Sequence, residues 1–263
     1  MKQFAVIGDP ISHSLSPVLH KEIYRQFGIE ASFEKTHVTP ASLSIFMNQN
    51  VLDGFNVTIP YKESIIPYLD ALDESAEVIA AVNCVAGEIG YNTDWIGFLK
   101  AMVGNGIEIN GKNCLIIGAG GAARAVGYAL VQAKAKSIIF QNRTKSRADQ
   151  LSSWINKLYP ENKPNERVDI MINCTPVGMW PDTDATPIDF QDIDENHVLA
   201  DTIYNPLETE WLKRGISKGA KIVNGLDMFI AQGLASADIW FGEKISKKID
   251  LEPIKKVLKS KLC

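Results

Sequence analysis

The sequence has little cysteine and no pattern of cysteines that would hold a metal. Its four cysteines, at positions 84, 114, 174 and 263, are widely separated among 263 residues and lack metal-ligand spacing. Two of them lie in or beside apolar, strand-like runs, which favours buried or idle thiols. We therefore expect no metal site.

A net basic charge, long apolar runs and internal repeats are also missing. The net charge of −4 provides no field for nucleic acid or an anionic membrane, so any anion must be bound locally. No apolar stretch is long enough to cross a bilayer, and the N-terminus passes directly into a strand without the features of a signal peptide. We expect a cytoplasmic protein that acts on a small molecule and binds neither nucleic acid nor membrane.

What the chain does contain is enough apolar sequence, 46%, for one large core or two moderate ones. Short apolar runs alternate with helix-like segments, which is an α/β pattern. In the first third, strands are expected at 4–7, 32–38, 54–59, 82–86 and 88–91, and helices at 17–27, 41–50, 62–69 and 94–103.

The rest of the chain predicts a parallel sheet with crossover helices. Strands are expected at 115–117, 137–140, 169–173, 198–201 and 221–223, and helices at 122–132, 145–158 and 207–218. The turn-rich segments 159–167 and 181–191 predict surface loops. Apolar residues at helical spacing in 254–262 predict a terminal helix with its lysines facing solvent.

A glycine cluster follows the apolar run 115–117 and opens the helix 122–132. Gly118, Gly120 and Ala123 fill a G-x-G-x-x-A pattern, which is used where backbone approaches a pyrophosphate. Glycine permits the tight turn, and the free N–H groups at the helix start face the anion. Alone the pattern is weak, because glycine-rich turns are common in α/β proteins. Its place in a βαβ unit favours a dinucleotide site.

The residues after the second strand of this unit indicate which dinucleotide binds. NAD-specific sites place Asp or Glu there, whereas this chain has Asn142, Arg143 and Thr144, followed by Arg147. A guanidinium about 4 Å from a phosphate charge gains roughly 4 kcal/mol at an effective dielectric of about 20, before desolvation. We therefore expect NADP. The alternative is that Arg143 and Arg147 are ordinary solvated residues at the start of the next helix.

Ser14 and Ser16 form a candidate site for a carboxylate. They lie two residues apart, just before Pro17, a favoured first helical residue. In an extended loop both hydroxyls point the same way, and the helix start behind them favours an anion. The alternative is that Ser16 caps the helix and Ser14 is a turn residue. For His13 and His20 the default is a solvated or packed histidine.

Lys62 and Asp94 form a candidate acid–base pair. Lys62 follows a strand and a proline turn at the expected start of a helix, where the helix dipole disfavours an ammonium. Asp94 lies at another strand-to-helix junction, where it could cap the helix and reach a neighbour. A cleft containing both would hold a proton donor beside a charge. Equally, Lys62 could be solvated and Asp94 a simple cap.

Seven motifs in order resemble the shikimate dehydrogenase family over nearly the whole chain. They are HSLSP at 13–17, NVTIPYK at 56–62, AVNC at 81–84, NTD at 92–94, GAGGAA at 118–123, NRT at 142–144, and Asn224-Gly225 through Gln232. The family reduces 3-dehydroshikimate to shikimate with NADPH, on the route to chorismate and the aromatic amino acids. The resemblance implies the same reversible reaction here.

The resemblance also implies roles for individual residues. Ser14 and Ser16 would hold the substrate carboxylate, and the other substrate contacts would be Thr58, Lys62, Asn83, Asp94, Tyr204 and Gln232. NADP would be held by Gly118, Ala119, Gly120, Gly121, Ala122, Ala123, Asn142, Arg143, Thr144 and Arg147, with Gly225 and Met228 near the nicotinamide. Lys62 would donate the proton to the developing alkoxide, and Asp94 would orient Lys62.

Two α/β domains are implied by the same resemblance. Residues 1–99 with 233–263 would form the substrate domain, and residues 100–232 a Rossmann-like NADP-binding domain, with the C-terminal helices returning to the first. The chain departs from the commoner family pattern at Cys84, where threonine is usual, and at Lys21, where asparagine is frequent. Both flank matched residues.

Two rival functions and two oligomeric states stay open at this point. An NAD-dependent quinate/shikimate dehydrogenase shares the fold, but Arg143 and Arg147 argue against NAD. A nucleotide-sensing protein without turnover is a rival of another class, and the presence of Lys62 and Asp94 argues against it. A monomer and a homodimer are both compatible with the sequence.

Overall fold

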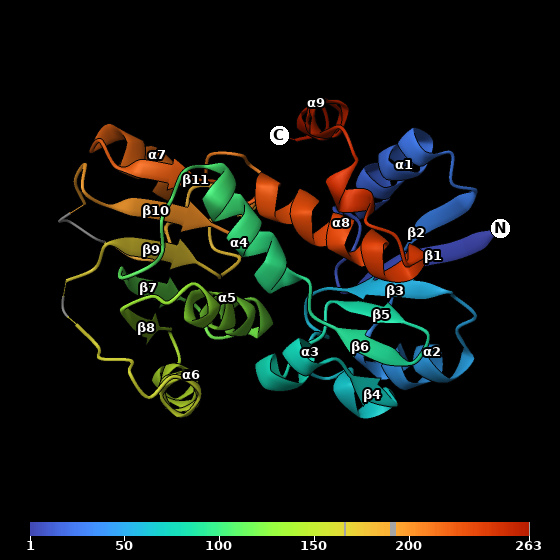
Figure 1. Cartoon of the computed structure of the whole chain (residues 1–263), viewed down its shortest axis with the longest axis horizontal. Helices are drawn as coiled ribbons and strands as arrows, with labels where there is room; N and C mark the ends of the chain where they lie inside the picture. Colours follow the sequence, from blue (N-terminus) through green and yellow to red (C-terminus); the bar gives the residue numbers. More distant parts are fainter. Residues whose placement is uncertain (166, 190–192, 263) are drawn as a thin grey trace. The chain divides into compact units, whose positions relative to one another are not determined.

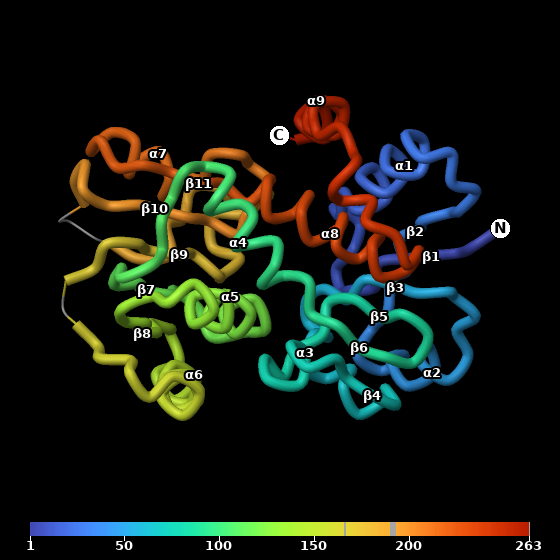
Figure 2. Tube along the Cα trace, viewed as in Figure 1, coloured from blue at the N-terminus to red at the C-terminus, as the bar shows by residue number. Residues whose placement is uncertain are grey.

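The computed structural model describes residues 1–165, 167–189 and 193–262. The chain divides into two compact units, and Cys263 lies outside the described residues. The first unit consists of Met1–Thr93 with Ile230–Lys261, and the second consists of Asp94–Phe229. The chain thus enters the second unit once and then returns to the first, as the trace in Figure 2 follows. This confirms the predicted fold class of two α/β parts with C-terminal helices that return to the first.

The first unit contains a mixed sheet with the strand order β2-β1-β3-β5-β6-β4 (Figure 1). Its strands are β1 (Lys2–Gly8), β2 (Ala31–His37), β3 (Gly54–Val57), β4 (Ala71–Leu72), β5 (Cys84–Ala86) and β6 (Ile89–Tyr91). Its helices are α1 (Ser16–Phe27), η1 (Pro40–Ser42), α2 (Leu43–Gln49), η2 (Ile66–Tyr68), α3 (Glu74–Ile79), η3 (Ile245–Lys247) and α9 (Leu251–Lys259), together with most of α8 (Leu226–Phe241). Strand β1 pairs in parallel with β2 and β3, whereas β5 is antiparallel to β3 and β6.

Alternation along β1 places core residues on both faces of this sheet. Ala5 and Ile7 pack in one cluster with Leu43 of α2. Phe4 points the other way and stacks on Trp240 of α8, with ring centroids 4.6 Å apart. The terminal helix α9 packs against α1 and is amphipathic as predicted, because Ile254 and Leu258 are buried and Lys256 and Lys259 are exposed.

The second unit contains a parallel sheet, as predicted, and its strand order is β11-β10-β9-β7-β8 (Figure 1). Its strands are β7 (Asn113–Ile117), β8 (Ser137–Gln141), β9 (Ile170–Asn173), β10 (Val198–Asp201) and β11 (Lys221–Val223). Its helices are α4 (Asp94–Gly104), α5 (Gly121–Gln132), α6 (Lys145–Leu158) and α7 (Glu210–Ser217), followed by the start of α8.

Both faces of the parallel sheet are covered, which explains its continuous apolar strands. Cys114 and Ile116 of β7 face a core built with α4, α5 and α6. Leu115 and Ile117 face the opposite side, where Trp211 of α7 is almost fully buried. Cys84 and Cys114 are buried free thiols in strands, as expected. None of the described helices has the length and apolar character that a membrane span requires.

Four segments differ from the sequence predictions. Residues 62–69 do not form an α-helix but a series of turns that ends in η2, because Pro67 has no N–H to donate inside a helix. Strand β4 and helix α3 were not predicted, although Asp73 caps α3 by accepting hydrogen bonds from Ser75 and Ala76. Helix α8 was missed because its sequence is apolar nearly all round, so it has little helical periodicity.

The two predicted surface loops fall partly outside the described residues. The described parts of 159–167 contain only the last turn after α6 and irregular backbone, and residue 166 lies outside them. The described parts of 181–191 contain turns and irregular backbone, and residues 190 and 191 lie outside them.

Candidate active site

The hydroxyls of Ser14 and Ser16 lie next to each other at the start of α1. The Oγ atom of Ser14 accepts a hydrogen bond from the Ser16 N–H at 3.3 Å and donates to the Ser16 Oγ at 3.2 Å. Helix α1 begins at Ser16, and Leu15 is the N-cap residue. The alternative that Ser16 is the N-cap is therefore wrong, and Pro17 is the second helical residue rather than the first. The paired hydroxyls at the positive end of a helix suit a carboxylate.

Asn83 joins two segments that lie far apart in the sequence. Its Nδ2 atom donates to the Oγ1 atom of Thr93 at 2.9 Å and to the Oε1 atom of Gln232 at 3.2 Å. Its Oδ1 atom accepts a hydrogen bond from the Thr93 N–H at 2.6 Å. Asn83 is 2% exposed. The side-chain amides of Asn83 and Gln232 are thereby fixed together in the first unit.

A buried layer behind Asn83 was not singled out in the sequence. The Nδ2 atom of Asn56, inside β3, donates to the backbone oxygen of Asn83 at 3.1 Å and to the Oγ atom of Ser236 at 2.9 Å. Ser236 in turn donates to the backbone oxygen of Gln232 at 3.1 Å. The available signal was an asparagine within the short buried strand GFNV, because a buried amide in a strand must find partners.

Thr58 and Lys62 follow β3 and are held by backbone hydrogen bonds. The Thr58 N–H donates to the backbone oxygen of Ile7 at 3.0 Å, and the backbone oxygen of Lys62 accepts from the Val82 N–H at 2.7 Å. Lys62 lies in a turn rather than at a helix start, so the predicted unfavourable interaction of its ammonium with a helix dipole is wrong. The Lys62 side chain is half-buried.

Asp94 is the first residue of α4 and is 4% exposed. It follows Thr93, whose backbone and hydroxyl are held by Asn83. Lys62 belongs to the first unit and Asp94 begins the second. Their pairing stays a prediction.

His20 is a packed histidine, as expected by default, while His13 is exposed. The His20 ring stacks on Phe33 with centroids 4.1 Å apart. Burial lowers the pKa of His20 to about 3, and the neighbouring Asn56 side chain opposes this shift. His20 is therefore neutral at physiological pH and does not supply a charge to the site.

The glycine turn after β7 has the shape that a pyrophosphate needs. Gly118 has a φ of +118°, and a Cβ atom there would lie 2.9 Å from the backbone oxygen of Cys174. Gly120 is the N-cap residue of α5 and makes no side-chain cap. Ala123 is fully buried, which lets the helix lie close to the sheet. A Cβ atom on Gly120 would meet no atom within 4 Å, so the N–H groups of the first α5 turn border open space in which an anion fits.

The turn after β8 carries the predicted cofactor-selecting residues. Asn142 donates to the backbone oxygen of Thr144 at 3.0 Å, and Thr144 is the N-cap residue of α6. Arg143 and Arg147 are exposed, and within the described ranges neither guanidinium has an ion-pair partner. No carboxylate lies among these residues, so the turn fits a 2′-phosphate.

Tyr204, Gly225 and Met228 come together in the second unit, at the end of β10 and the start of α8. The Tyr204 ring stacks on Phe229 with centroids 4.3 Å apart. The Gly225 N–H donates to the backbone oxygen of Ile203 at 2.9 Å, and a Cβ atom on Gly225 would collide with the Thr202 oxygen. Met228 is 7% exposed.

Comparison with known proteins places these geometries in a family. The family model described as shikimate dehydrogenase substrate binding domain matches residues 6–85, and the model described as shikimate / quinate 5-dehydrogenase matches residues 100–176. The shikimate dehydrogenase (NADP(+)) of Methanococcus maripaludis is 42% identical, over 99% of this chain and 98% of that protein. The enzyme of the same name from Shouchella clausii is 40% identical, over 94% and 95%.

Solved structures agree with these relatives. A crystal structure of shikimate 5-dehydrogenase from Thermus thermophilus, in complex with NADP(H) and shikimate, superposes with a TM-score of 0.87 and 32% identity, covering 100% of both chains. With two family models across both units and relatives of about 40% identity over nearly the full length, the chain belongs to the shikimate dehydrogenase family.

Proposed function

We propose that this protein catalyses the reversible, NADPH-dependent reduction of 3-dehydroshikimate to shikimate. The observation that carries the proposal is the fixed pair Asn83 and Gln232, joined by a 3.2 Å hydrogen bond, in a unit that also presents the hydroxyls of Ser14 and Ser16. These groups suit a polyhydroxylated ring acid, because amides bind ring hydroxyls and the paired serines bind a carboxylate.

In the first unit we assign the substrate contacts to the residues that the family motifs predict. Ser14 and Ser16 hold the carboxylate, and Thr58, Asn83 and Gln232 bind the ring hydroxyls. Asp94 and Tyr204 are the remaining substrate contacts that the family motifs predict. The complex of the Thermus thermophilus relative with shikimate supports this assignment of substrate.

The proton chemistry is assigned to Lys62 and Asp94. Lys62 donates a proton to the developing alkoxide and stabilises its negative charge, and Asp94 orients the Lys62 ammonium and a substrate hydroxyl. The backbone of Lys62 is already held by Val82, which limits the positions open to its side chain. In the direction of alcohol oxidation Lys62 accepts the proton.

NADP fits the second unit. When bound in its reduced form, NADPH, it would supply the hydride for ketone reduction. The residues that would hold it are the glycine turn 118–123 at the pyrophosphate, Asn142, Arg143, Thr144 and Arg147 at the 2′-phosphate, and Gly225 and Met228 near the nicotinamide. The open space at Gly120, where a Cβ atom would meet no atom within 4 Å, and the exposed guanidiniums support this assignment. Residues 1–99 with 233–263 then act as the substrate domain, and residues 100–232 as the cofactor domain.

We further propose that the enzyme acts in the cytoplasm, as a monomer or a homodimer. The acidic net charge of −4 gives it no affinity for nucleic acid.

A crossed assay of two substrates and two cofactors tests the function. Purified protein is given shikimate or quinate with NADP or NAD, and initial rates are measured over a range of concentrations. We expect the highest kcat/KM with shikimate and NADP. Comparable kcat/KM with quinate and NAD would instead assign the catabolic activity, and no turnover with any pair would contradict an enzymatic function.

A further inference from the structure

Asp201 is a buried carboxylate to which the proposed function gives no role. It ends β10 and is 4% exposed. Its Oδ1 atom accepts hydrogen bonds from the Ile203 N–H at 2.9 Å and from Asn173 Nδ2 at 3.2 Å, and its Oδ2 atom accepts from the Thr209 hydroxyl at 2.9 Å. One side chain therefore holds groups from β9, from the loop after β10 and from the N-cap of α7.

Through Asn173 the carboxylate reaches the segment beside the glycine turn. Asn173 and Asp201 are paired residues at the ends of the parallel strands β9 and β10. Asn173 Nδ2 also donates to the backbone oxygen of Val177 at 3.3 Å, and its Oδ1 atom accepts from the Thr175 N–H at 3.0 Å. The Cys174 oxygen in this segment is the atom that a Cβ on Gly118 would meet. Asp201 thus helps to fix the backbone against which the glycine turn rests.

Through Ile203 the same carboxylate reaches the segment assigned to the nicotinamide end. The N–H of Ile203 is bound by Asp201, and its backbone oxygen accepts the Gly225 N–H at 2.9 Å. Tyr204 is the next residue in the chain. The position of Tyr204 relative to Gly225 therefore depends on a peptide that Asp201 holds.

We propose that Asp201 is a positioning residue for NADP binding, whose carboxylate sets the segments 174–177 and 202–204 in the arrangement that receives the dinucleotide. The proposal rests on the proposed function, because it assumes that NADP binds at the carboxyl edge of the parallel sheet. Ligands of open α/β sheets bind at that edge.

The charge of Asp201 fits the proposed positioning role better than a role in stability alone. The groups that face it are the neutral amide of Asn173, the N–H groups of Thr202 and Ile203, and the hydroxyl of Thr209. Burial raises the pKa of Asp201 to about 6, while these hydrogen bonds oppose the shift. The ionised form is thus present at neutral pH at a cost in stability, since a buried carboxylate without a cation is unfavourable.

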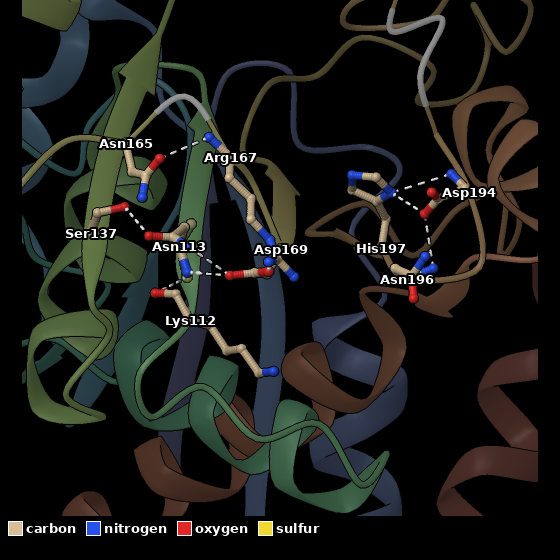
Figure 3. A network of polar contacts seen from close by, with 10 residues as sticks. Lys112, Asn113, Ser137, Asn165, Arg167, Asp169, Asp194, Asn196 and His197 are labelled. Carbon is tan, nitrogen blue, oxygen red and sulfur yellow. Dashed lines mark hydrogen bonds and ion pairs between the residues drawn. The ribbon is translucent and has the colours of Figure 1, made fainter.

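Asp169 provides a matched control at the opposite edge of the same sheet. It precedes β9, and its Oδ2 atom accepts from the N–H and the Nδ2 of Asn113, each at 2.8 Å (Figure 3). Arg167 lies 3.2 Å from its other oxygen. Asp169 resembles Asp201 in anchoring an asparagine, but it lies at the amino ends of the strands, away from the proposed cofactor edge.

The test compares Asp201→Asn, Asp201→Ala and Asp169→Asn with the wild type. The Kd for NADP is measured by calorimetry, Tm by thermal unfolding, and KM for shikimate at saturating NADP. We expect Asp201→Asn to raise the Kd for NADP about fivefold and Asp201→Ala more, because weakening one or several hydrogen bonds costs about 1 kcal/mol each. The KM for shikimate should rise by a smaller factor than the Kd for NADP, because Tyr204 is the one proposed substrate contact within the segments that Asp201 holds. Asp169→Asn should lower Tm and leave the Kd for NADP unchanged.

A pH series on proteins that fold gives a second readout. Affinity of the wild type for NADP should weaken as the pH falls through about 6, where Asp201 takes up a proton. The 2′-phosphate of NADP titrates in the same range, but it does so with both proteins. The wild type should therefore show a steeper decrease than Asp201→Asn.

The proposal is overturned if Asp201→Asn binds NADP with the wild-type Kd and pH dependence, whether or not its Tm falls. Equal losses of NADP affinity in Asp201→Asn and Asp169→Asn would also overturn it, because they would show a general effect of stability. Wild-type protein that binds NADP but does not oxidise shikimate would refute the proposed function alone.

Discussion

The side-chain amide of Asn83 donates to the side-chain oxygen of Gln232 at 3.2 Å, across 149 positions of sequence. Gln232 lies in α8, the helix in which the chain returns to the first unit after it has passed through the second. The proposed substrate site therefore needs both ends of the chain, and its polar groups are fixed by one another before any ligand binds. Such preorganisation lowers the entropy that binding must overcome.

Replacing Asn83 with alanine should impair substrate binding and stability together. The change removes two donated hydrogen bonds and leaves the buried Thr93 N–H without its acceptor. We expect a loss of about 1–3 kcal/mol in the free energy of unfolding and a rise in the KM for shikimate of about tenfold. Steady-state kinetics at saturating NADP and chemical denaturation measure the two effects.

Asn113→Ala is the control for that variant. Asn113 is also a buried asparagine with several hydrogen bonds, but it lies in the second unit at the amino end of β7. It should lower stability without changing the KM for shikimate. If both variants raise that KM equally, Asn83 has no specific part in substrate binding.

Two alanine substitutions in the cofactor turn should differ in their effect on stability and on NADP binding. Gly118→Ala is strained, because φ is +118° and the new Cβ would meet the Cys174 oxygen, so it should cost about 1–3 kcal/mol of stability. Gly120→Ala meets no atom within 4 Å and should leave Tm nearly unchanged. It should still raise the Kd for NADP, because backbone approaches the pyrophosphate there. An unchanged Kd in Gly120→Ala would place the pyrophosphate elsewhere.

Much of the parallel sheet could be predicted from sequence, and the reason is physical. Strands buried on both faces have continuous apolar runs, so the bounds of β10 were predicted without error. The 62–69 segment was misassigned because its apolar spacing resembles a helix although Pro67 prevents one. Helix α8 gives no periodic signal, since it is apolar nearly all round.

In the candidate site, too, residues in local motifs could be predicted from the sequence, whereas contacts between distant residues could not. Ser14, Lys62 and Gly118 stand in recognisable local motifs, so sequence alone suggested them as site residues. Asn56 and Ser236 bond to each other across 180 positions, and Asp201 bonds to Asn173 across 28 positions, so only the folded chain brings these partners within hydrogen-bonding distance.

The preference for NADP should depend on Arg143 and Arg147. Arg143 is exposed in the turn after β8 and Arg147 is exposed in the first turn of α6, so both are available to a 2′-phosphate. The double variant Arg143→Ala/Arg147→Ala should lose roughly tenfold or more in kcat/KM with NADP and little with NAD. Kinetics with each cofactor at saturating shikimate give the ratio. Arg214→Ala/Arg25→Ala, which removes two other exposed guanidiniums, should keep the wild-type ratio.

Acid stability should depend on His20. Its folded pKa of about 3 lies below the ordinary value of 6.5, so the unfolded chain binds the extra proton between these values. The stabilising contribution is complete above pH 6.5 and is lost as the pH falls toward 3. Between these two pKa values, the contribution of His20 to the free energy of unfolding falls by about 1.4 kcal/mol for each unit by which the pH is lowered.

His20→Phe should remove that loss, because phenylalanine keeps the stacking on Phe33 and does not titrate. Urea unfolding at several pH values between 4 and 7 measures the effect, and His13→Gln at an exposed histidine serves as the control. Identical acid dependence in the wild type and His20→Phe would show that His20 is not protonated on unfolding in this range.

The most direct test of the central claim is the rate at which purified protein and its Lys62→Ala variant form NADPH from shikimate and NADP, followed by ultraviolet absorbance. We predict turnover by the wild type and a kcat about 10²–10⁴-fold lower in the variant, with a smaller change in KM, as loss of general acid–base catalysis requires. An unchanged kcat in Lys62→Ala, or no NADPH formed by the wild type, would contradict the account.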